Sequence, residues 1–336
     1  LPQDQELANT LTAAAHHMNR KAGKELFFYL QRQRVWQEPQ NQYMGWERKR
    51  GALMELNCLL AGKENGYCRR SGMLPQVDFV LTLDEDTVLP YGTVAKLVGA
   101  AMHPLNRPQV QGGVVVSGYG VFKPRETHSL EEVDRTWFSK IFAGEGGISR
   151  YVAPVDFYQA RFGESIYMGK GLYDPKLFLQ LLGDALPDHR VLSHDLLEGA
   201  FVRCGSVPEA TFLEPYPAQY LGYMRREHRW IRGDWQLLPF LRKTIHNRKG
   251  GRQHNPISGF AKWEIADNLR RSLLPPLQLT ALYAASMQGN WRWGAAVLAS
   301  LFFPALAAAA KALVHRRANW KQVSRALHTN VWQAVF

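Results

Sequence analysis

Two carboxylates one residue apart, Asp84 and Asp86, follow a short apolar segment within Val77–Pro90. The segment is rich in β-branched residues and short for a helix, so it predicts a buried strand. Ligands of open α/β sheets bind just beyond the carboxyl ends of the strands. Carboxylates this close repel each other unless a cation lies between them, and Mg²⁺ that also holds substrate phosphates meets that need. The pattern fits nucleotide-sugar transfer; a solvated acidic turn is the alternative.

Two basic pairs have the chemistry to bind the phosphates of such a substrate. Lys49 and Arg50 lie at the start of a predicted helix, where backbone N–H groups already favour anions. Arg226 and Arg229 share one helical face, and arginine binds phosphate through two hydrogen bonds at once. The alternatives are a solvated basic face for the first pair and a membrane-surface helix for the second.

An acceptor sugar would meet a different set of side chains. Gly169 and Gly171 permit close approach of the backbone. Tyr173 offers a flat ring to a sugar face, and Asp174 offers an acceptor for a hydroxyl group. Trp230 can line the path of the sugar chain. An ordinary glycine turn before a helix is the alternative for the glycine-rich stretch.

Asp195 is the predicted general base, which takes the proton from the acceptor hydroxyl. Glu198 lies one helical turn later and is the second choice for this role. Ser193 can cap a helix that begins here, and a carboxylate in the first turn is stabilised by the helix dipole. A purely structural first-turn acid is therefore the alternative.

The elements that must position these groups alternate between helices and strands. Hydrophobic spacing predicts helices over residues 1–24, 48–61, 91–102, 175–182 and 195–202, and strands over residues 27–35, 77–83 and 110–117. This alternation predicts a largely parallel sheet covered on both faces. Residues 118–175, rich in glycine and aromatic residues, are predicted to form a long functional loop.

The chain becomes more apolar after residue 255. Residues 272–287 contain two prolines near their start and fit an interfacial, re-entrant or spanning helix. Residues 293–313 carry no charge until Lys311 and are long enough to cross a bilayer, with a buried alanine-rich core helix as the alternative. Lysine and arginine on both outer flanks place those flanks in the cytoplasm.

The net positive charge of the chain indicates which kinds of molecule it could bind. The chain has 336 residues and a formal net charge of +12, which suggests nucleic acid, an anionic membrane surface or phosphate-bearing substrates. The basic residues cluster beside apolar segments, which favours a membrane surface over nucleic acid. Three cysteines without a C-x-x-C motif imply neither a disulfide framework nor a zinc site, so a reducing compartment is expected.

Seven motifs together resemble glycosyltransferase family 84, the synthase part of cyclic β-1,2-glucan synthases, within the wider group of family 2-like membrane-bound glycosyltransferases. The motifs are GWERKRG, TLDEDTVLP, IFAGEGGISRY, FGESIYMGKGLYD, SHDLLEG, HRWIRGDWQ and DNLRRSLLPP. They cover most of residues 45–276. Two positions depart from the wider group, which has Gln where this chain has Arg226 and Glu where it has His194. No clear first strand of a nucleotide-binding half precedes residue 25.

The resemblance implies a GT-A fold, an α/β architecture with a Rossmann-like, mixed but mostly parallel sheet. The expected organisation is a GT-A domain over residues 1–245, a basic interfacial segment over 246–271, a transmembrane or membrane-associated helix pair over 272–314, and a cytoplasmic tail over 315–336. Further domains of a longer polypeptide are also expected.

The implied activity is that of an inverting hexosyltransferase, which moves glucose from UDP-glucose to a growing β-1,2-glucan at the cytoplasmic face of a bacterial inner membrane. Asp84 and Asp86 would hold Mg²⁺ or Mn²⁺, and Arg226, Arg229 and Trp230 would contact the leaving diphosphate and the acceptor. The alternatives are a membrane polysaccharide synthase of other sugar or linkage specificity and a non-catalytic, membrane-tethered glycan-binding module.

Overall fold

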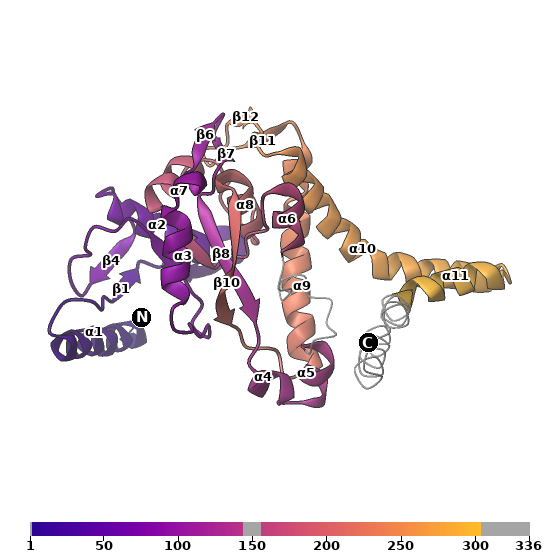
Figure 1. The fold of residues 1–336 in the computed structure, drawn as a ribbon, viewed down its shortest axis with the longest axis horizontal. Helices are drawn as coiled ribbons and strands as arrows, with labels where there is room; N and C mark the ends of the chain where they lie inside the picture. Colours follow the sequence, from indigo (N-terminus) through magenta and orange to yellow (C-terminus); the bar gives the residue numbers. More distant parts are fainter. Residues whose placement is uncertain (1, 144–155, 304–336) are drawn as a thin grey trace.

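A computed structural model describes residues 2–143 and 156–303 of the chain (Figure 1). The α-helices are α1 Pro2–Ala22, α2 Arg48–Leu60, α3 Thr93–Met102, α4 Leu130–Asp134, α5 Trp137–Phe142, α6 Phe157–Phe162, α7 Pro175–Leu182, α8 Asp195–Val202, α9 Tyr220–Gln236, α10 Gly259–Met287 and α11 Trp291–Leu301. The 3₁₀ helices are η1 Glu38–Gln40, η2 Pro104–Asn106 and η3 Leu238–Leu241. The strands are β1 Leu30–Arg32, β2 Val35–Gln37, β3 Gln42–Met44, β4 Tyr67–Arg70, β5 Val80–Thr82, β6 Gln109–Gln111, β7 Val114–Ser117, β8 Val121–Thr127, β9 Gly171–Tyr173, β10 Cys204–Leu213, β11 Thr244–His246 and β12 Arg252–His254.

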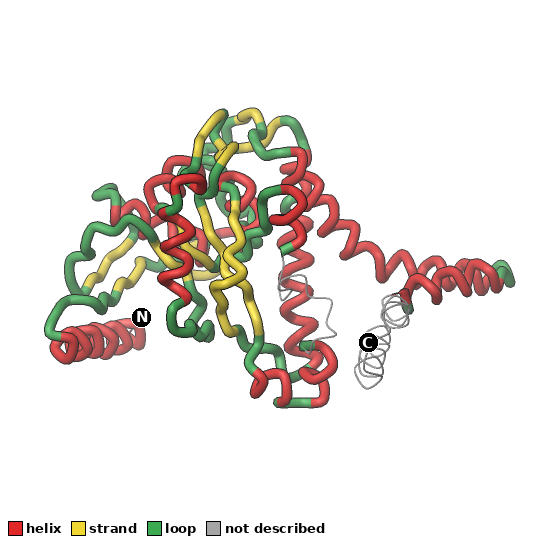
Figure 2. The backbone as a smooth tube through the Cα atoms, in the orientation of Figure 1, coloured by secondary structure: helices red, strands yellow, loops and turns green. Residues whose placement is uncertain are grey.

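The central sheet has four strands in the order β10-β8-β9-β5. β10 runs parallel to β8, whereas β9 runs antiparallel to both β8 and β5. β5, β8 and β10 therefore run in the same direction and only β9 runs against them, so the central sheet is mixed, as the resemblance implied. The remaining described strands form two-stranded ribbons outside this sheet (Figure 2). The strand predicted over residues 110–117 is one of these ribbons, the hairpin of β6 and β7.

Gly171 allows the short strand β9 to lie against β8. A Cβ atom at this position would stand 2.4 Å from the carbonyl oxygen of Phe122 in β8. Its φ of 153° also lies in a range that other residues rarely adopt. The predicted close backbone approach at Gly171 is thus seen, but the neighbour is protein backbone within the sheet.

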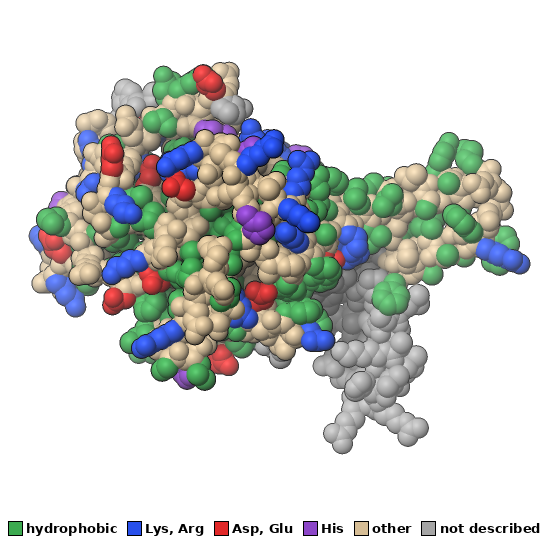
Figure 3. Space-filling model, turned by 90° about the horizontal axis from the view of Figure 1, so that it is seen from above, with side chains coloured by type: hydrophobic (Ala, Val, Ile, Leu, Met, Phe, Trp, Pro, Cys, Tyr) green, Lys and Arg blue, Asp and Glu red, His purple; other side chains and the backbone are tan. Residues whose placement is uncertain are grey.

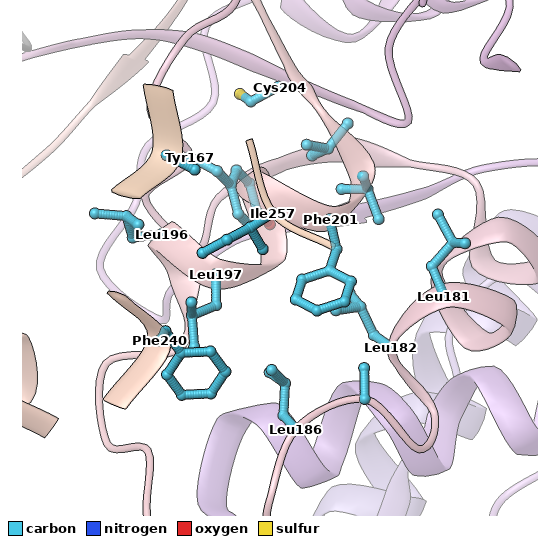
Figure 4. Close-up of a cluster of buried hydrophobic side chains, with 14 of the residues drawn as sticks. Tyr167, Leu181, Leu182, Leu186, Leu196, Leu197, Phe201, Cys204, Phe240 and Ile257 are labelled. Carbon is cyan, nitrogen blue, oxygen red and sulfur yellow. The ribbon is translucent and has the colours of Figure 1, made fainter. Parts of the chain in front are cut away.

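The larger hydrophobic core surrounds α7 and α8 (Figure 4). α7 buries Leu177, Phe178, Leu181 and Leu182, which share one face of the helix. Full burial of such a side chain contributes about 1.5–3 kcal/mol. Both helices have the bounds that the sequence predicted, and their packing gives the first turn of α8 a rigid support.

The stretch predicted to be a long loop, residues 118–175, is largely ordered where it is described. It contains β8, the short helices α4, α5 and α6, and β9. None of these elements was predicted. The helices have only 5 or 6 residues, too few to show a hydrophobic periodicity, although each has a side-chain cap. Asp156, for example, accepts hydrogen bonds from the backbone N–H groups of Tyr158 and Gln159 at the start of α6.

α10 and α11 extend away from the body of the molecule (Figure 1). α10 remains helical through Pro275 and Pro276. Exposed apolar side chains gather along this arm (Figure 3), namely Leu273, Leu274, Leu277, Leu279, Tyr283, Met287, Trp291, Trp293, Leu298 and Phe303.

The predicted pair of membrane spans is not found in the described part of the chain. Over residues 2–143 and 156–303, no helix has both the length and the hydropathy to cross a bilayer. Residues 272–287, expected to form an interfacial, re-entrant or spanning helix, lie in α10. The second expected span, residues 293–313, runs beyond the described residues.

Candidate active site

Asp84 follows β5 by two residues and is clamped between two ammonium groups. Lys49 Nζ lies 2.5 Å from Asp84 Oδ1, and Lys170 Nζ lies 3.1 Å from Asp84 Oδ2. Partial burial would raise the pKa of Asp84, but the hydrogen bond and charge of Lys49, together with Lys170, hold it below the ordinary value. Asp86 lies exposed in the turn that follows. Two ammonium groups thus hold Asp84 in place, unlike a carboxylate of a freely solvated turn.

Lys170 is a site residue that the sequence reasoning missed, although it stands between the two predicted glycines. Its ammonium group bridges Asp84 and Glu214, and Glu214 also accepts a hydrogen bond from Thr87 Oγ1 at 2.8 Å. Burial raises the pKa of nearby Glu126 to about 7, with the charge of Lys170 acting in the opposite direction. Lys170 therefore links the acidic turn after β5 to Glu214, the residue that follows β10.

Asp195 opens α8, and Gly169 lies directly against it. A Cβ at Gly169 would stand 2.5 Å from Asp195 Oδ1, and the φ of +79° at this position also favours glycine. Burial raises the pKa of Asp195, and the charges of Lys49 and Asp84 reach it as well. Lys170, the residue after Gly169, pairs with Asp84, so the fold brings Lys49, Asp84, Gly169 and Asp195 to neighbouring positions.

His194 and Glu198 form a buried pair beside Asp195. His194 Nδ1 lies 2.8 Å from Glu198 Oε1 and 3.4 Å from Asp195 Oδ1. The ligand-type atoms of these three residues lie within 4.8 Å of one another. The shortest of these contacts is the separation of a hydrogen-bonded ion pair. We therefore interpret the group as a protonated histidine between two carboxylates.

Arg226 lies inside a cage of aromatic rings on one side of α9. Its guanidinium carbon stands 5.1 Å, 5.6 Å and 4.7 Å from the ring centroids of Tyr216, Tyr223 and Trp230. Arg229 is exposed, and Trp230 keeps 45% of its surface exposed. α9 reaches the site through Gly233, which packs against Ser193 just before α8. The arginines are thus on the helix next to the site, and the rings, not a carboxylate, hold Arg226.

Arg50 does not join Lys49 at the site. Its side chain is buried and pairs with Glu47 at 2.7 Å and with Asp188 at 3.6 Å. It also donates to the carbonyl oxygens of Leu186 and Pro187. The predicted contact of Arg50 with a donor phosphate does not fit this position, because protein encloses the guanidinium group.

Tyr173 and Asp174 also have structural roles. Tyr173 is 1% exposed, its ring lies 4.3 Å from that of Phe178, and its hydroxyl donates to Asn57 Oδ1. Asp174 caps α7 by accepting hydrogen bonds from the backbone of Lys176 and Leu177. The predicted stacking of Tyr173 on a sugar does not fit a ring enclosed in the core, and the Asp174 carboxylate already serves the helix.

We expect Arg50→Met to lower the free energy of unfolding by about 3–5 kcal/mol, because it leaves the buried Glu47 carboxylate without its cation. Lys49→Met is the matched control. Its side chain is 37% exposed, so the stability change should stay below about 1 kcal/mol. Urea denaturation of both variants checks this. Equal destabilisation by the two substitutions would contradict the assignment of Arg50 to the interior.

No protein-family model matches the chain. Among curated proteins, the chain is 44% identical over 273 residues to the cyclic beta-(1,2)-glucan synthase NdvB of Rhizobium meliloti (strain 1021). The match covers 80% of this chain and 9% of that protein, so the chain spans a small part of its relative. Identity at this level over most of the chain shows common descent. The chain is therefore homologous to one segment of a cyclic β-(1,2)-glucan synthase.

Proposed function

We propose that this chain carries the active site of an inverting hexosyltransferase that moves glucose from UDP-glucose to a growing β-1,2-glucan. The observation that carries the proposal is the convergence of Asp195, Asp84 and Lys49 from α8, the end of β5 and α2. A potential base thus stands near a carboxylate–ammonium group suited to a diphosphate. The relative is a glucan synthase, which agrees with this chemistry.

The proposed reaction is a single displacement at the anomeric carbon of glucose. The acceptor oxygen forms a bond to this carbon while the bond to the diphosphate oxygen breaks, and UDP leaves. Asp195 accepts the proton of the acceptor hydroxyl. Lys49 and Lys170 are positioned to neutralise negative charge on the leaving diphosphate, and electrostatic stabilisation of this kind is usually the largest catalytic contribution.

Asp84 and Asp86 suit a hard divalent ion, because carboxylate oxygens are ligands that Mg²⁺ and Mn²⁺ accept. Asp84 is ionised, and its oxygens now contact the two lysines. Mg²⁺ or Mn²⁺ held by the two carboxylates would supply positive charge to the diphosphate. The lysines would then turn from Asp84 towards the phosphate oxygens.

The proposal includes a GT-A fold and a place at the cytoplasmic face of a bacterial inner membrane. The mixed sheet with a carboxylate after β5 supports the first part. The second is supported by the exposed apolar side chains along α10 and α11, with Arg270 and Arg271 at the base of this arm. Apolar side chains beside basic ones suit an anionic lipid surface.

The test supplies the purified chain with radiolabelled UDP-glucose, Mg²⁺ and a short β-1,2-glucan. We expect label in the oligosaccharide, new glucose units linked through position 2 in the β configuration, and loss of transfer after chelation. UDP-galactose and UDP-N-acetylglucosamine are competing donors. Transfer of another sugar or formation of another linkage would support a different polysaccharide synthase. Saturable glucan binding without any transfer would support a glycan-binding module.

A further inference from the structure

Glu198 is the most completely buried acidic residue beside the candidate site, and its placement needs an explanation. The residue is 1% exposed, and His194 is 7% exposed. Within the described part of the chain, the Glu198 oxygens and His194 Nδ1 make no regular hydrogen bond, and His194 Nδ1 has ion-pair contacts with Glu198 at 2.8 Å and with Asp195 at 3.4 Å. A buried, ionised carboxylate is costly unless a cation pairs with it. The contact is satisfied only when a proton lies between the two atoms.

The surroundings favour that proton on His194. Two carboxylates, Glu198 and Asp195, face the imidazole from α8. Burial would lower the pKa of His194, but these two charges outweigh it and raise the pKa to about 9, with Arg50 of α2 opposing them. Of the other groups nearby, Tyr167 faces Glu198 and Asp195, and Glu264 of α10 lines a small cavity with Tyr167 and the middle of α8.

We propose that Glu198 is a positioning residue, which keeps a proton on His194 Nδ1 so that this N–H group holds Asp195 towards the acceptor hydroxyl. The inference rests on the proposed function, because it takes Asp195 as the base. Geometry supports it, since one imidazole nitrogen lies within reach of both carboxylates. The charge of His194 also opposes the rise that burial causes in the pKa of Asp195. Burial, Glu198 and Asp84 raise its pKa, and His194 and Lys49 lower it.

The stabilisation from the His194–Glu198 pair should decrease as the pH rises. The histidine pKa is raised from an ordinary 6.5 to about 9. The pairing therefore contributes stability that is fully present below pH 6.5 and is lost as the pH rises through about 9. The hold on Asp195 should be lost over the same range, so transfer should fall only above about pH 9.

Glu198→Gln keeps the shape of the side chain and removes its charge. We expect the alkaline limb of the kcat/KM profile to move from about pH 9 to near 6.5, the ordinary histidine pKa. At pH 8 this shift corresponds to a loss of about 30-fold, which should shrink as the pH is lowered towards 6. Glu164→Gln is the control, because this partly buried carboxylate pairs with Arg203 outside the site at 3.6 Å. Its pH profile should match that of the wild type.

An NMR titration of His194 in the wild-type chain, assigned with His194→Gln, tests the proposal without relying on the folding of Glu198→Gln. A pKa near 9 supports the pairing, and a pKa near 6.5 overturns it. An unchanged pH profile in folded Glu198→Gln also overturns the proposal. A metal ion bound stoichiometrically by the wild-type chain and lost in both Glu198→Gln and His194→Gln overturns it too. If Asp195→Asn retains full transfer, the proposed function itself fails. An inactive Asp195→Asn with an unchanged Glu198→Gln profile refutes this inference alone.

Discussion

Asp195→Asn is expected to lower the rate of glucose transfer by about 10²- to 10⁴-fold, the usual contribution of a general base. The amide keeps the size of the carboxylate and its place against Gly169, but it cannot accept the proton of the acceptor hydroxyl. Because the proposed donor contacts lie elsewhere, at Lys49 and Asp84, the Kd for UDP-glucose should change little under the proposal. Single-turnover kinetics and donor titration separate these two quantities.

Asp174→Asn is the matched control for that experiment. Asp174 is also a carboxylate at a helix start, where its side chain accepts two backbone hydrogen bonds, and asparagine caps helices about as well. Transfer by this variant should therefore stay close to the wild-type rate. If both Asp→Asn substitutions gave the same small loss, Asp195 would be only a first-turn acid that stabilises α8.

The helices that support the site are predictable because their signals are local. α7 has Asp174 as its cap, Pro175 at its first position and apolar residues on one face. α8 begins at Asp195 as expected, but its cap position is His194, which makes no side-chain cap, and not Ser193. These features lie within a few residues of one another. Helix bounds and the position of Asp195 could therefore be predicted from the sequence.

The direction of a strand and the orientation of a side chain depend on contacts between residues that are far apart in the sequence. β9 has three residues, and nothing within them indicates that they run antiparallel between β5 and β8. Lys49 and Arg50 are equally basic neighbours, yet the turn of α2 directs one to Asp84 and the other into the interior. The ring of Tyr173 is likewise enclosed by residues from α2 and α7.

The resemblance assigned Arg226 to the leaving group, and the structure adds a physical condition to that prediction. Three aromatic rings surround the guanidinium group, and its buried Nε has no hydrogen-bond partner among the described atoms. Cation–π contacts of this kind contribute about 0.5–2 kcal/mol each, depending on exposure. The rings thus fix the position of Arg226 on α9, whereas exposed Arg229 has no such constraint from these rings.

Asp84→Asn and Asp86→Asn are expected to impair glucose transfer in the same way if the two carboxylates hold a divalent ion. Each should reduce transfer by about 10²-fold or more, because a bound ion stabilises charge in the transition state by several kcal/mol. Each variant should also need a higher Mg²⁺ concentration for half-maximal rate. Glu85→Gln is the control, because it neutralises an exposed carboxylate between the two without removing a proposed ligand.

The same variants distinguish two roles for Asp84, as a ligand of a divalent ion or as the partner that positions Lys49 and Lys170. If Asp84 serves only to place Lys49 and Lys170, then Asp84→Asn alone should lose activity, and added Mg²⁺ should not restore it. Lys170→Met tests the role of the lysine alone. It removes the cation that contacts Asp84 and Glu214, but it removes no proposed ligand of the divalent ion. Under the proposal, Lys170→Met weakens transfer without changing the Mg²⁺ concentration needed. If Asp86→Asn turns over at the wild-type rate, Asp86 is not a metal ligand, and the proposed site with two carboxylate ligands is refuted.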